Sequence, residues 1–430
     1  MAFKRLITVT IEKLVFGGQG MGRVDNKVYF VWNALPGEVV TVEVTKKKKN
    51  FCEGYAVEII QASPQRVPPQ EEHYGSCSPW QILSPSDEQT WKVQLAKDSY
   101  FKFQQSPAIQ ALTLVDDLSQ YYGYRNKMEY SFTHDDSGAL TFGFFKRGTH
   151  WRQPIQPCVL ASTAINRTAQ TILDWLKTLS VTDHNLKSLI ILSNEQGETI
   201  AGLFVRDHDL PLTPLPTLTN NLGFTIYFSN PRSPASIPTA VIEQRGSTTI
   251  TDTVLGTPLQ HDLLGFFQVN VPIFAQALQT IATYVDPGTK LLDCYGGVGA
   301  ISLPLQAKVK SCIIIESNVE ATAAANHNIQ QLGLTHYTAR CVATEQVLEA
   351  ITSDQTVIVD PPRAGLHDDV TGRLLTVQPR RIIYLSCNLS TQARDVERLL
   401  ERYVIRDAKL FNFFPRTPHI EGLIVLDPRL

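Results

Sequence analysis

The chain has 430 residues, which exceeds one ordinary hydrophobic core and predicts two or three domains. Hydrophobic residues make up 43% and charged residues 19%, a mixture that excludes extended disorder, and the net charge of -2 requires any polyanionic partner to meet a local basic patch. Seven scattered cysteines form no disulfide framework, and we find no signal-peptide core or bilayer-spanning apolar run, so we expect a cytoplasmic protein without a membrane partner.

Residues 1–62 contain short strands broken by glycine and proline, of which Leu6–Leu14 and Val39–Val44 alternate most clearly. Strands at this spacing predict a small antiparallel barrel. The segment has nine basic and six acidic residues, so its net charge of +3 is opposite in sign to that of the whole chain. A basic barrel can hold a nucleic-acid backbone, although the consecutive lysines Lys46–Lys49 alone are more typical of a solvated hairpin tip.

The glycine-rich run Gly17–Gly22 looks at first like a phosphate-binding loop. Such a loop needs a helix behind it, because the free N–H groups at the helix N-terminus meet the anion. The apolar stretch Val28–Val31 that follows is typical of a strand. We therefore interpret the glycine run as a turn.

Residues 63–262 are predicted to form a central, mainly β domain that opens with the proline-rich linker 63–69. An amphipathic helix is expected over 87–105 and is a candidate to pack on the C-terminal domain, and a second helix is expected over 163–179. The predicted strands cover 127–133, 140–145, 188–192 and 199–205.

Residues 263–430 change to alternating helices and strands, which indicates a parallel sheet with crossover connections and a Rossmann-like α/β domain. The predicted helices cover 271–284, 301–307, 318–332 and 367–375. The predicted strands cover 290–294, 311–315, 355–359 and 380–386, with two closing strands at 408–414 and 420–426.

A glycine turn follows the first strand of this domain, in Asp293-Cys294-Tyr295-Gly296-Gly297-Val298-Gly299. This arrangement lets a ligand approach the backbone at the carboxyl end of the sheet. The dinucleotide pattern GxGxxG fails, because its third glycine position is Ser302. Glu316 ends the second strand and can accept hydrogen bonds from ribose hydroxyls, so these residues fit either NAD or S-adenosylmethionine.

The fourth strand ends in Asp360, followed by two prolines that pre-set a rigid loop. Methyltransferases that act on exocyclic amines have an aromatic residue after these prolines, and Arg363 stands there instead. The next strand, 381–386, is followed by Cys387 at the edge where such sheets carry their active sites. An isolated cysteine is more commonly a small buried apolar residue, so its sequence context has to favour a catalytic role.

Together these segments resemble the RNA 5-methyluridine methyltransferase family. The matching stretches run in the family's order over nearly the whole chain, and they are Ile11–Gly37, Tyr124–Lys127, Phe266–Asn270, DCYGGVG, DPPRAG, SCN and Pro418–Glu421. The resemblance implies an α/β Rossmann-like methyltransferase domain preceded by an OB-like TRAM barrel and a central mainly β domain, with S-adenosylmethionine as cofactor. It also implies RNA as the partner, bound by the barrel and the central domain, and gives no sign of an obligate protein partner.

The resemblance further implies a mechanism in which Cys387 adds to carbon 6 of a uridine and Glu421 removes the proton from carbon 5 after methylation. Because an ordinary thiol of pKa about 8.5 is mostly protonated at pH 7, we expect the site to lower the pKa of Cys387. The residues matched to the family's cofactor positions are Gln268, Tyr295, Glu316 and Asp360.

Many family members also carry a four-cysteine iron–sulfur site, and this chain departs from that pattern. The four matched positions are Glu71, Cys77, Trp80 and Cys158, so two thiolates are missing, and we predict neither a cluster nor another metal. The barrel favours ribosomal over transfer RNA, with a loop or flipped uridine as the target. A non-catalytic RNA-binding protein and an amine or small-molecule methyltransferase are the alternatives.

Overall fold

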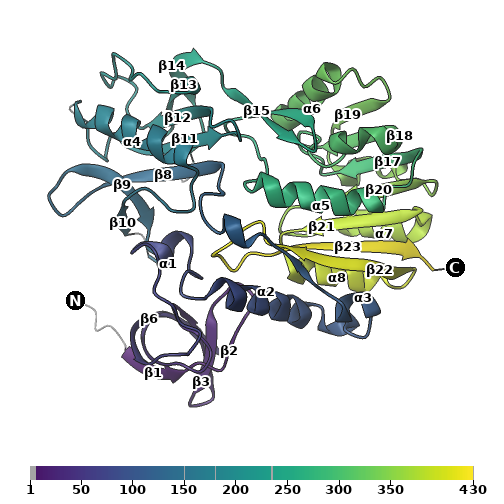
Figure 1. The fold of residues 1–430 in the computed structure, drawn as a ribbon, viewed down its shortest axis with the longest axis horizontal. Helices are drawn as coiled ribbons and strands as arrows, with labels where there is room; N and C mark the ends of the chain where they lie inside the picture. The colour runs from purple at the N-terminus through teal and green to yellow at the C-terminus, as the bar shows by residue number, and fades with distance from the viewer. Residues whose placement is uncertain (1–5, 150, 180, 234–235, 430) are drawn as a thin grey trace.

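The computed structural model describes residues 6–149, 151–179, 181–233 and 236–429. Its first part is a curled six-stranded sheet in the order β1-β5-β6-β4-β3-β2, closed around Val9, Val31, Val40 and Val42 (Figure 1). The first part of the glycine run is a turn, as predicted, whereas its second part, Gly20–Gly22, opens β3. The strands are β1 (Leu6–Thr10), β2 (Lys13–Leu14), β3 (Gly20–Val24), β4 (Lys27–Trp32), β5 (Val39–Lys47) and β6 (Phe51–Gln61).

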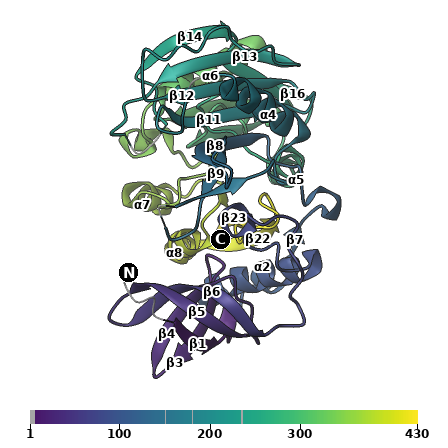
Figure 2. The same ribbon diagram turned by 90° about the vertical axis from the view of Figure 1, so that its left-hand side faces the viewer.

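A helical segment leads away from the barrel and packs on the C-terminal sheet. Helix α2 (Pro85–Ser99) begins at the cap residue Ser84 and ends before the predicted 105, because the chain turns into a 3-10 helix at Phe101. Leu95 and Tyr100 are fully buried in the core beneath the C-terminal sheet, and α2 lies between that sheet and the barrel in both views (Figures 1 and 2). The other elements are α1 (Tyr74–Cys77), α3 (Pro107–Gln110) and β7 (Leu114–Val115).

The middle of the chain forms a seven-stranded sheet in the order β10-β9-β8-β11-β12-β13-β14, which is antiparallel except for the β12–β13 pair. Helix α4 (Thr163–Lys177) covers it with an apolar face that includes Ile165, Ile172 and Leu176. A separate hairpin, β15 (Thr249–Val254) and β16 (Thr257–Asp262), follows. The sheet strands are β8 (Lys127–His134), β9 (Leu140–Phe145), β10 (Arg152–Ile155), β11 (Leu186–Ser193), β12 (Thr199–Val205), β13 (Asn221–Phe228) and β14 (Ala240–Gly246).

The C-terminal part is an eight-stranded sheet in the order β19-β18-β17-β20-β21-β23-β22-β7, with helices on both faces. Strands β17 to β21 run parallel, and β23 is inserted antiparallel between β21 and β22. Its strands are β17 (Thr289–Cys294), β18 (Val309–Glu316), β19 (Tyr337–Cys341), β20 (Gln355–Val359), β21 (Arg381–Ser386), β22 (Tyr403–Phe411) and β23 (Glu421–Pro428), and its helices are α5 (Val271–Thr283), α6 (Val319–Gln331), α7 (Asp368–Val377) and α8 (Leu389–Leu399).

The predicted architecture, a Rossmann-like α/β domain preceded by a small β-barrel and a mainly β middle part, is confirmed. Several local predictions are wrong: 301–307 is a 3-10 helix over Leu303–Lys308, and the strand expected at 408–414 spans Tyr403–Phe411. Strand β19 and helix α8 were not predicted. Both have short or polar sequences that become regular by packing on the sheet. In the described residues, no helix is long and apolar enough to cross a membrane.

Candidate active site

A cavity of about 710 Å³ opens at the carboxyl ends of β17, β18, β20 and β21. Open α/β sheets bind ligands at this edge. All six residues that the sequence singles out line this one cavity, and they are Gln268, Tyr295, Glu316, Asp360, Cys387 and Glu421.

The glycine turn after β17 has the backbone of a ligand cradle. Tyr295 has φ of 62°, a left-handed conformation that is uncommon for a bulky residue and costs roughly 1–3 kcal/mol. Gly297 has φ of 55° and lines the cavity, and a Cβ added there would meet no atom within 4 Å. The strained turn therefore leaves open space beside the backbone, where a nucleotide-like ligand has room.

The carboxylate of Glu316 is held at the end of β18 by the same turn. It accepts hydrogen bonds from the backbone N–H of Gly297 at 3.0 Å and of Asn318 at 2.7 Å. Each oxygen keeps further acceptor capacity, which suits the paired hydroxyls of a ribose. The donor set and the open cradle thus fit the adenosine part of S-adenosylmethionine, with Glu316 and Tyr295 as the residues that would hold it.

Gln268 lies on the opposite wall, just before α5. The cap of α5 is Asn270, whose side chain accepts from the N–H of Ile273, so the capping role that could have explained Gln268 belongs to another residue. The backbone of Gln268 is tied to the central sheet, because Asn126 Nδ2 donates to its carbonyl at 3.0 Å. The Tyr124–Lys127 segment therefore positions this wall of the cavity.

Two buried carboxyl groups lie under the site. Burial raises the pKa of Asp293 to about 6 and that of Asp360 to about 7, and the charge of Asp293 adds to the shift of Asp360. Asp360 remains partly exposed to the cavity that it lines, whereas Asp293 is fully buried. A cationic ligand such as a sulfonium would lower both pKa values on binding, since it favours the charged carboxylates.

Strand pairing brings Cys387 and Glu421 together although 33 residues separate them in the chain. Strands β21 and β23 are antiparallel, and Ser386 is paired with Gly422. The next pair of positions along this register is Cys387 and Glu421, at the edge of the cavity. Opposed residues in antiparallel strands have Cα atoms about 4.5–5.5 Å apart, which allows both side chains to reach one ligand.

The electrostatics of this pair correct one sequence-based expectation. The pKa of the Cys387 thiol is raised, first by burial and then by the carboxylates of Glu421 and Asp360, so the prediction that the protein lowers it is wrong for the ligand-free site. Arg363 opposes the shift through its charge and a hydrogen bond. Burial, followed by the charge of Asp360, also raises the pKa of Glu421 well above its usual range.

Three features of the site escaped the sequence reasoning. Arg363 was read only as a missing aromatic ring, yet it is the cation that faces the thiol. Phe266 is 74% exposed at the cavity lining, where its ring can stack on a base. The third feature is the support for Glu421, in which α2 takes part. Of the three, only Arg363 could have been found from the sequence, as a basic residue three positions after Asp360 in DPPRAG.

Helix α2 anchors the loop before Glu421 through a buried ionic cluster. The side chains of Glu88 and Lys92 are 0% exposed and lie 2.9 Å apart, and Arg416 Nη1 lies 3.0 Å from Glu88. Glu88 also accepts from the backbone N–H of Arg416, and Lys92 donates to the carbonyl of Phe414. The loop that carries His419 and leads to Glu421 is thereby held from outside its own domain.

The barrel also touches this loop. A Cβ at Gly18 would lie 2.3 Å from Cβ of Pro418, and Trp80 Nε1 donates to the carbonyl of Gly18 at 3.2 Å. The glycine turn is therefore a contact between the barrel and the catalytic edge of the sheet. The hydrogen bond to Gly18 places the Trp80 indole in this interface.

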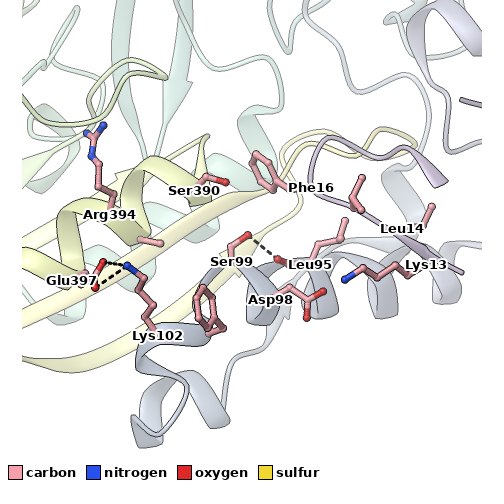
Figure 3. Close-up of a pocket in the computed structure, with 13 residues that line it drawn as sticks. Lys13, Leu14, Phe16, Leu95, Asp98, Ser99, Lys102, Ser390, Arg394 and Glu397 are labelled. Carbon is pink, nitrogen blue, oxygen red and sulfur yellow. Dashed lines mark hydrogen bonds and ion pairs between the residues drawn. The ribbon is translucent and has the colours of Figure 1, made fainter. Parts of the chain in front are cut away.

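A second concavity, of about 430 Å³, lies between β2, α2 and α8 (Figure 3). Two of its charged residues pair with each other, in the double contact of Lys102 Nζ with Glu397 at 2.7 and 2.9 Å. None of the six predicted site residues lines it. We therefore interpret it as a groove between packed units, and we assign the candidate active site to the cavity of about 710 Å³.

The remaining residues of the predicted iron–sulfur pattern cluster elsewhere. Glu71, Cys77 and Cys158 lie together, and the fourth member of their group is His73 instead of Trp80. A four-iron cluster normally takes four thiolates, each on a different iron. Two thiols, one carboxylate and one imidazole within 4.8 Å of one another do not fit that group.

The fold and the site are those of a class I methyltransferase. Comparison with known proteins shows which methyltransferases this chain is similar to. A family model described as tRNA (Uracil-5-)-methyltransferase matches residues 262–429, and one described as TRAM domain matches residues 5–57. A protein of Lactiplantibacillus plantarum named as an uncharacterized RNA methyltransferase is 29% identical, over 98% of this chain and 97% of its own length. A similarly named protein of Nitratidesulfovibrio vulgaris is 27% identical, over 98% and 95%.

The fold is also that of a solved structure, the Pyrococcus abyssi tRNA (uracil-54, C5)-methyltransferase in complex with S-adenosyl-L-homocysteine. That structure superposes with a TM-score of 0.80 at 22% identity, covering 98% of this chain and 100% of the other. Residues 262–429 are thus identified as a tRNA (Uracil-5-)-methyltransferase domain and residues 5–57 as a TRAM domain.

Proposed function

We propose that the enzyme converts one specific uridine in RNA to 5-methyluridine through a covalent adduct of Cys387, with ribosomal RNA as the first candidate substrate. One observation carries the assignment of roles. The register of β21 and β23 sets Cys387 beside Glu421, in the cavity that also contains Gln268, Tyr295, Glu316 and Asp360.

In the proposed mechanism, the thiolate of Cys387 adds to carbon 6 of uracil, which forms a C–S bond and makes carbon 5 nucleophilic. S-adenosylmethionine, when bound, supplies the methyl group that carbon 5 receives. Glu421 then takes the proton from carbon 5, the double bond between carbons 5 and 6 re-forms, and the C–S bond breaks. Arg363 assists by stabilising the thiolate against the burial that disfavours it.

The cofactor residues divide by chemistry. Glu316 accepts from the ribose hydroxyls, and the ring of Tyr295 and the amide of Gln268 form the walls. Asp360 offers a carboxylate whose raised pKa makes it responsive to a positive charge on the ligand. The Cys387→Ala variant should bind the cofactor normally, because the thiol is not one of these groups.

The RNA is proposed to lie over the barrel and the central sheet, with the target base flipped into the cavity. The exposed ring of Phe266 is placed to stack on a base at the entrance. The contact of Gly18 with Pro418 supports a role for the barrel in orienting RNA at the catalytic edge.

Transfer RNA is the second candidate, and a specific observation favours it. The Pyrococcus abyssi tRNA (uracil-54, C5)-methyltransferase covers 98% of this chain including the barrel. The barrel therefore supports RNA binding but does not by itself separate the two RNA classes.

The decisive experiment uses 5-fluorouridine-substituted ribosomal and transfer RNA in separate reactions with cofactor. Fluorine at carbon 5 cannot leave as a proton, so the adduct should persist as a protein–RNA band on a denaturing gel. The band should disappear in Cys387→Ala and persist in Cys341→Ala, an exposed cysteine outside the cavity. A band retained by Cys387→Ala would remove Cys387 from the proposed role, and a band with transfer RNA only would reverse the choice of substrate.

A further inference from the structure

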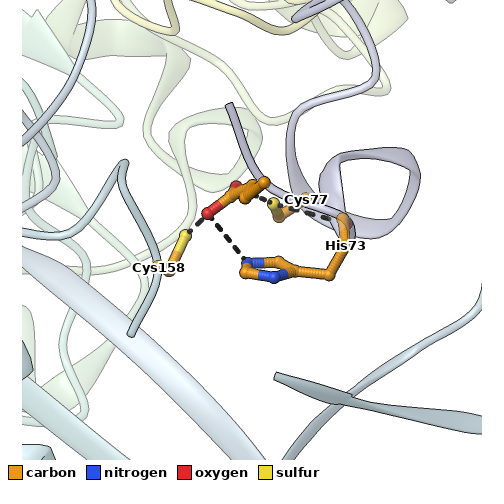
Figure 4. A group of neighbouring side chains, drawn as sticks. His73, Cys77 and Cys158 are labelled. Atoms are coloured by element: carbon orange, nitrogen blue, oxygen red, sulfur yellow. Dashed lines mark hydrogen bonds and ion pairs between the residues drawn. The ribbon is translucent and has the colours of Figure 1, made fainter. Parts of the chain in front are cut away.

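A compact group of four metal-ligating side chains lies outside the active site. Cys77 ends α1, Glu71 and His73 precede α1, and Cys158 comes from the segment before α4 of the central domain. One ligand atom from each lies within 4.8 Å of the other three. Figure 4 shows Cys77 and the ring of His73, from the segment around α1, near Cys158, which comes from a separate stretch of chain.

The distances that join three of these side chains to the carboxylate of Glu71 are close to those between ligands of a single ion. Cys77 Sγ lies 3.2 Å and Cys158 Sγ 3.9 Å from Glu71 Oε1, and His73 Nε2 lies 3.0 Å from Glu71 Oε2. Tetrahedral zinc, with Zn–S of about 2.3 Å and Zn–N or Zn–O of about 2.0 Å, holds its ligand atoms roughly 3.3–3.8 Å apart. A four-iron cluster would need a wider cage, because each cysteine binds a different iron.

One ligand atom of the group has an ion-pair partner but no well-aligned hydrogen bond in the protein. The His73 side chain is 5% exposed, and its Nε2 makes no hydrogen bond of acceptable geometry despite the short distance to Glu71. Buried polar atoms without a hydrogen bond are uncommon and expensive. An ion at the centre of the group would satisfy this nitrogen.

The surroundings orient the carboxylate as outer-shell groups do in metal sites. Gln81 Nε2 donates to Glu71 Oε1 at 3.0 Å, and the backbone N–H of Val159 donates to Oε2 at 3.0 Å. Such partners fix a ligand in place and are typical of the second shell of zinc sites.

We propose that Glu71, His73, Cys77 and Cys158 bind one zinc ion in a closed, structural site. The donor set of two thiolates, an imidazole and a carboxylate is one that zinc accepts. The ion would tie the segment after the barrel to the central sheet. The same junction contains the hydrogen bond from Tyr74 to Asn33 at 2.9 Å and the guanidinium of Arg147, 4.1 Å from the Trp32 ring.

The test uses the full-length chain, purified anaerobically without a metal-binding tag and analysed for zinc, iron and sulfide. We expect one zinc per chain with no stoichiometric iron. Replacement of that zinc by Co²⁺ should produce the visible bands of four-coordinate cobalt and a thiolate charge-transfer band in the ultraviolet. Removal of zinc by a chelator should lower the melting temperature, and added Zn²⁺ should restore it.

Matched variants separate this site from adventitious binding. Cys77→Ser and Cys158→Ser should each lose the thiolate band and most of the zinc, and Glu71→Gln, which keeps the side-chain shape, should weaken zinc retention at least tenfold. Cys341→Ser should keep one zinc. Stoichiometric iron and sulfide, a folded wild-type protein without zinc, or unchanged zinc in Cys77→Ser would each overturn the proposal.

Discussion

Replacing Glu88 by Gln tests whether α2 supports the catalytic edge through buried charge. The substitution keeps the size of the side chain and removes its charge, which leaves Lys92 and Arg416 without the carboxylate that pairs both. Since the side chains of Glu88 and Lys92 are 0% exposed and that of Arg416 is 3% exposed, water cannot replace the lost partner. Breaking a buried ion pair in this way costs about 3–5 kcal/mol.

The expected change is large enough for calorimetry. At roughly 2–4 °C per kcal/mol for a unit of 150–250 residues, the transition of the C-terminal unit should fall by about 6–20 °C. The matched control is Glu397→Gln, which breaks the exposed pair of Lys102 and Glu397 at 2.7 Å, with side chains 53% and 45% exposed. An exposed pair contributes about 0–1 kcal/mol, so the control should shift the transition by less than about 4 °C.

The same variant should separate binding from catalysis. Glu88 holds the loop before Glu421 but lies outside the cavity, so methyl transfer should slow while cofactor affinity stays close to that of the wild type. A melting shift for Glu88→Gln no larger than that of Glu397→Gln would refute the reasoning, because it would mean that the buried charges are solvated or neutralised without cost.

Four further predictions concern the site and its contact with the barrel. Glu421→Gln should accumulate the Cys387–RNA adduct and slow turnover by about 10²–10⁴-fold; normal turnover without an adduct would exclude the base role. Because the pKa values of Cys387 and Glu421 are both raised and both groups act deprotonated, the single-turnover rate should rise with pH, and a rate that falls between pH 6 and 8 would contradict this. In the cofactor-free protein, Asp360 keeps its proton up to about pH 7, whereas in the unfolded chain it releases the proton near pH 4. The free energy of unfolding should therefore fall as pH rises through this window, by at most about 1.4 kcal/mol per pH unit. Thermal melts should find a smaller fall in Asp360→Asn. Gly18→Val should clash with Pro418 and lower kcat/KM for RNA at least tenfold without changing cofactor binding, and an unchanged kcat/KM would show that the barrel contact is dispensable.

The sequence alone determined the class of the C-terminal fold and the residues of the site. Strand β20 is buried at every position and ends in the apolar run Val357-Ile358-Val359. The alternation of such strands with helices is readable because a parallel sheet imposes crossover connections. Glu316 ends a strand, and Asp360 and Cys387 each follow one directly, so strand boundaries were sufficient to place them at one edge. The resemblance carried by DPPRAG, SCN and Pro418–Glu421 indicated the proposed reaction, which strand order alone could not indicate.

Only the tertiary structure decided which distant segments meet. Cys387 and Glu421 are neighbours because β23 enters antiparallel between β21 and β22, a pairing that local residue preferences do not encode. Glu88 reaches Arg416 across more than 300 residues, and a charged pair on an apparently amphipathic helix gave no sign of full burial. His73, and not Trp80, lies with Cys77 and Cys158, because the chain before α1 folds back over the central sheet. Such contacts depend on packing between units and not on spacing along the chain.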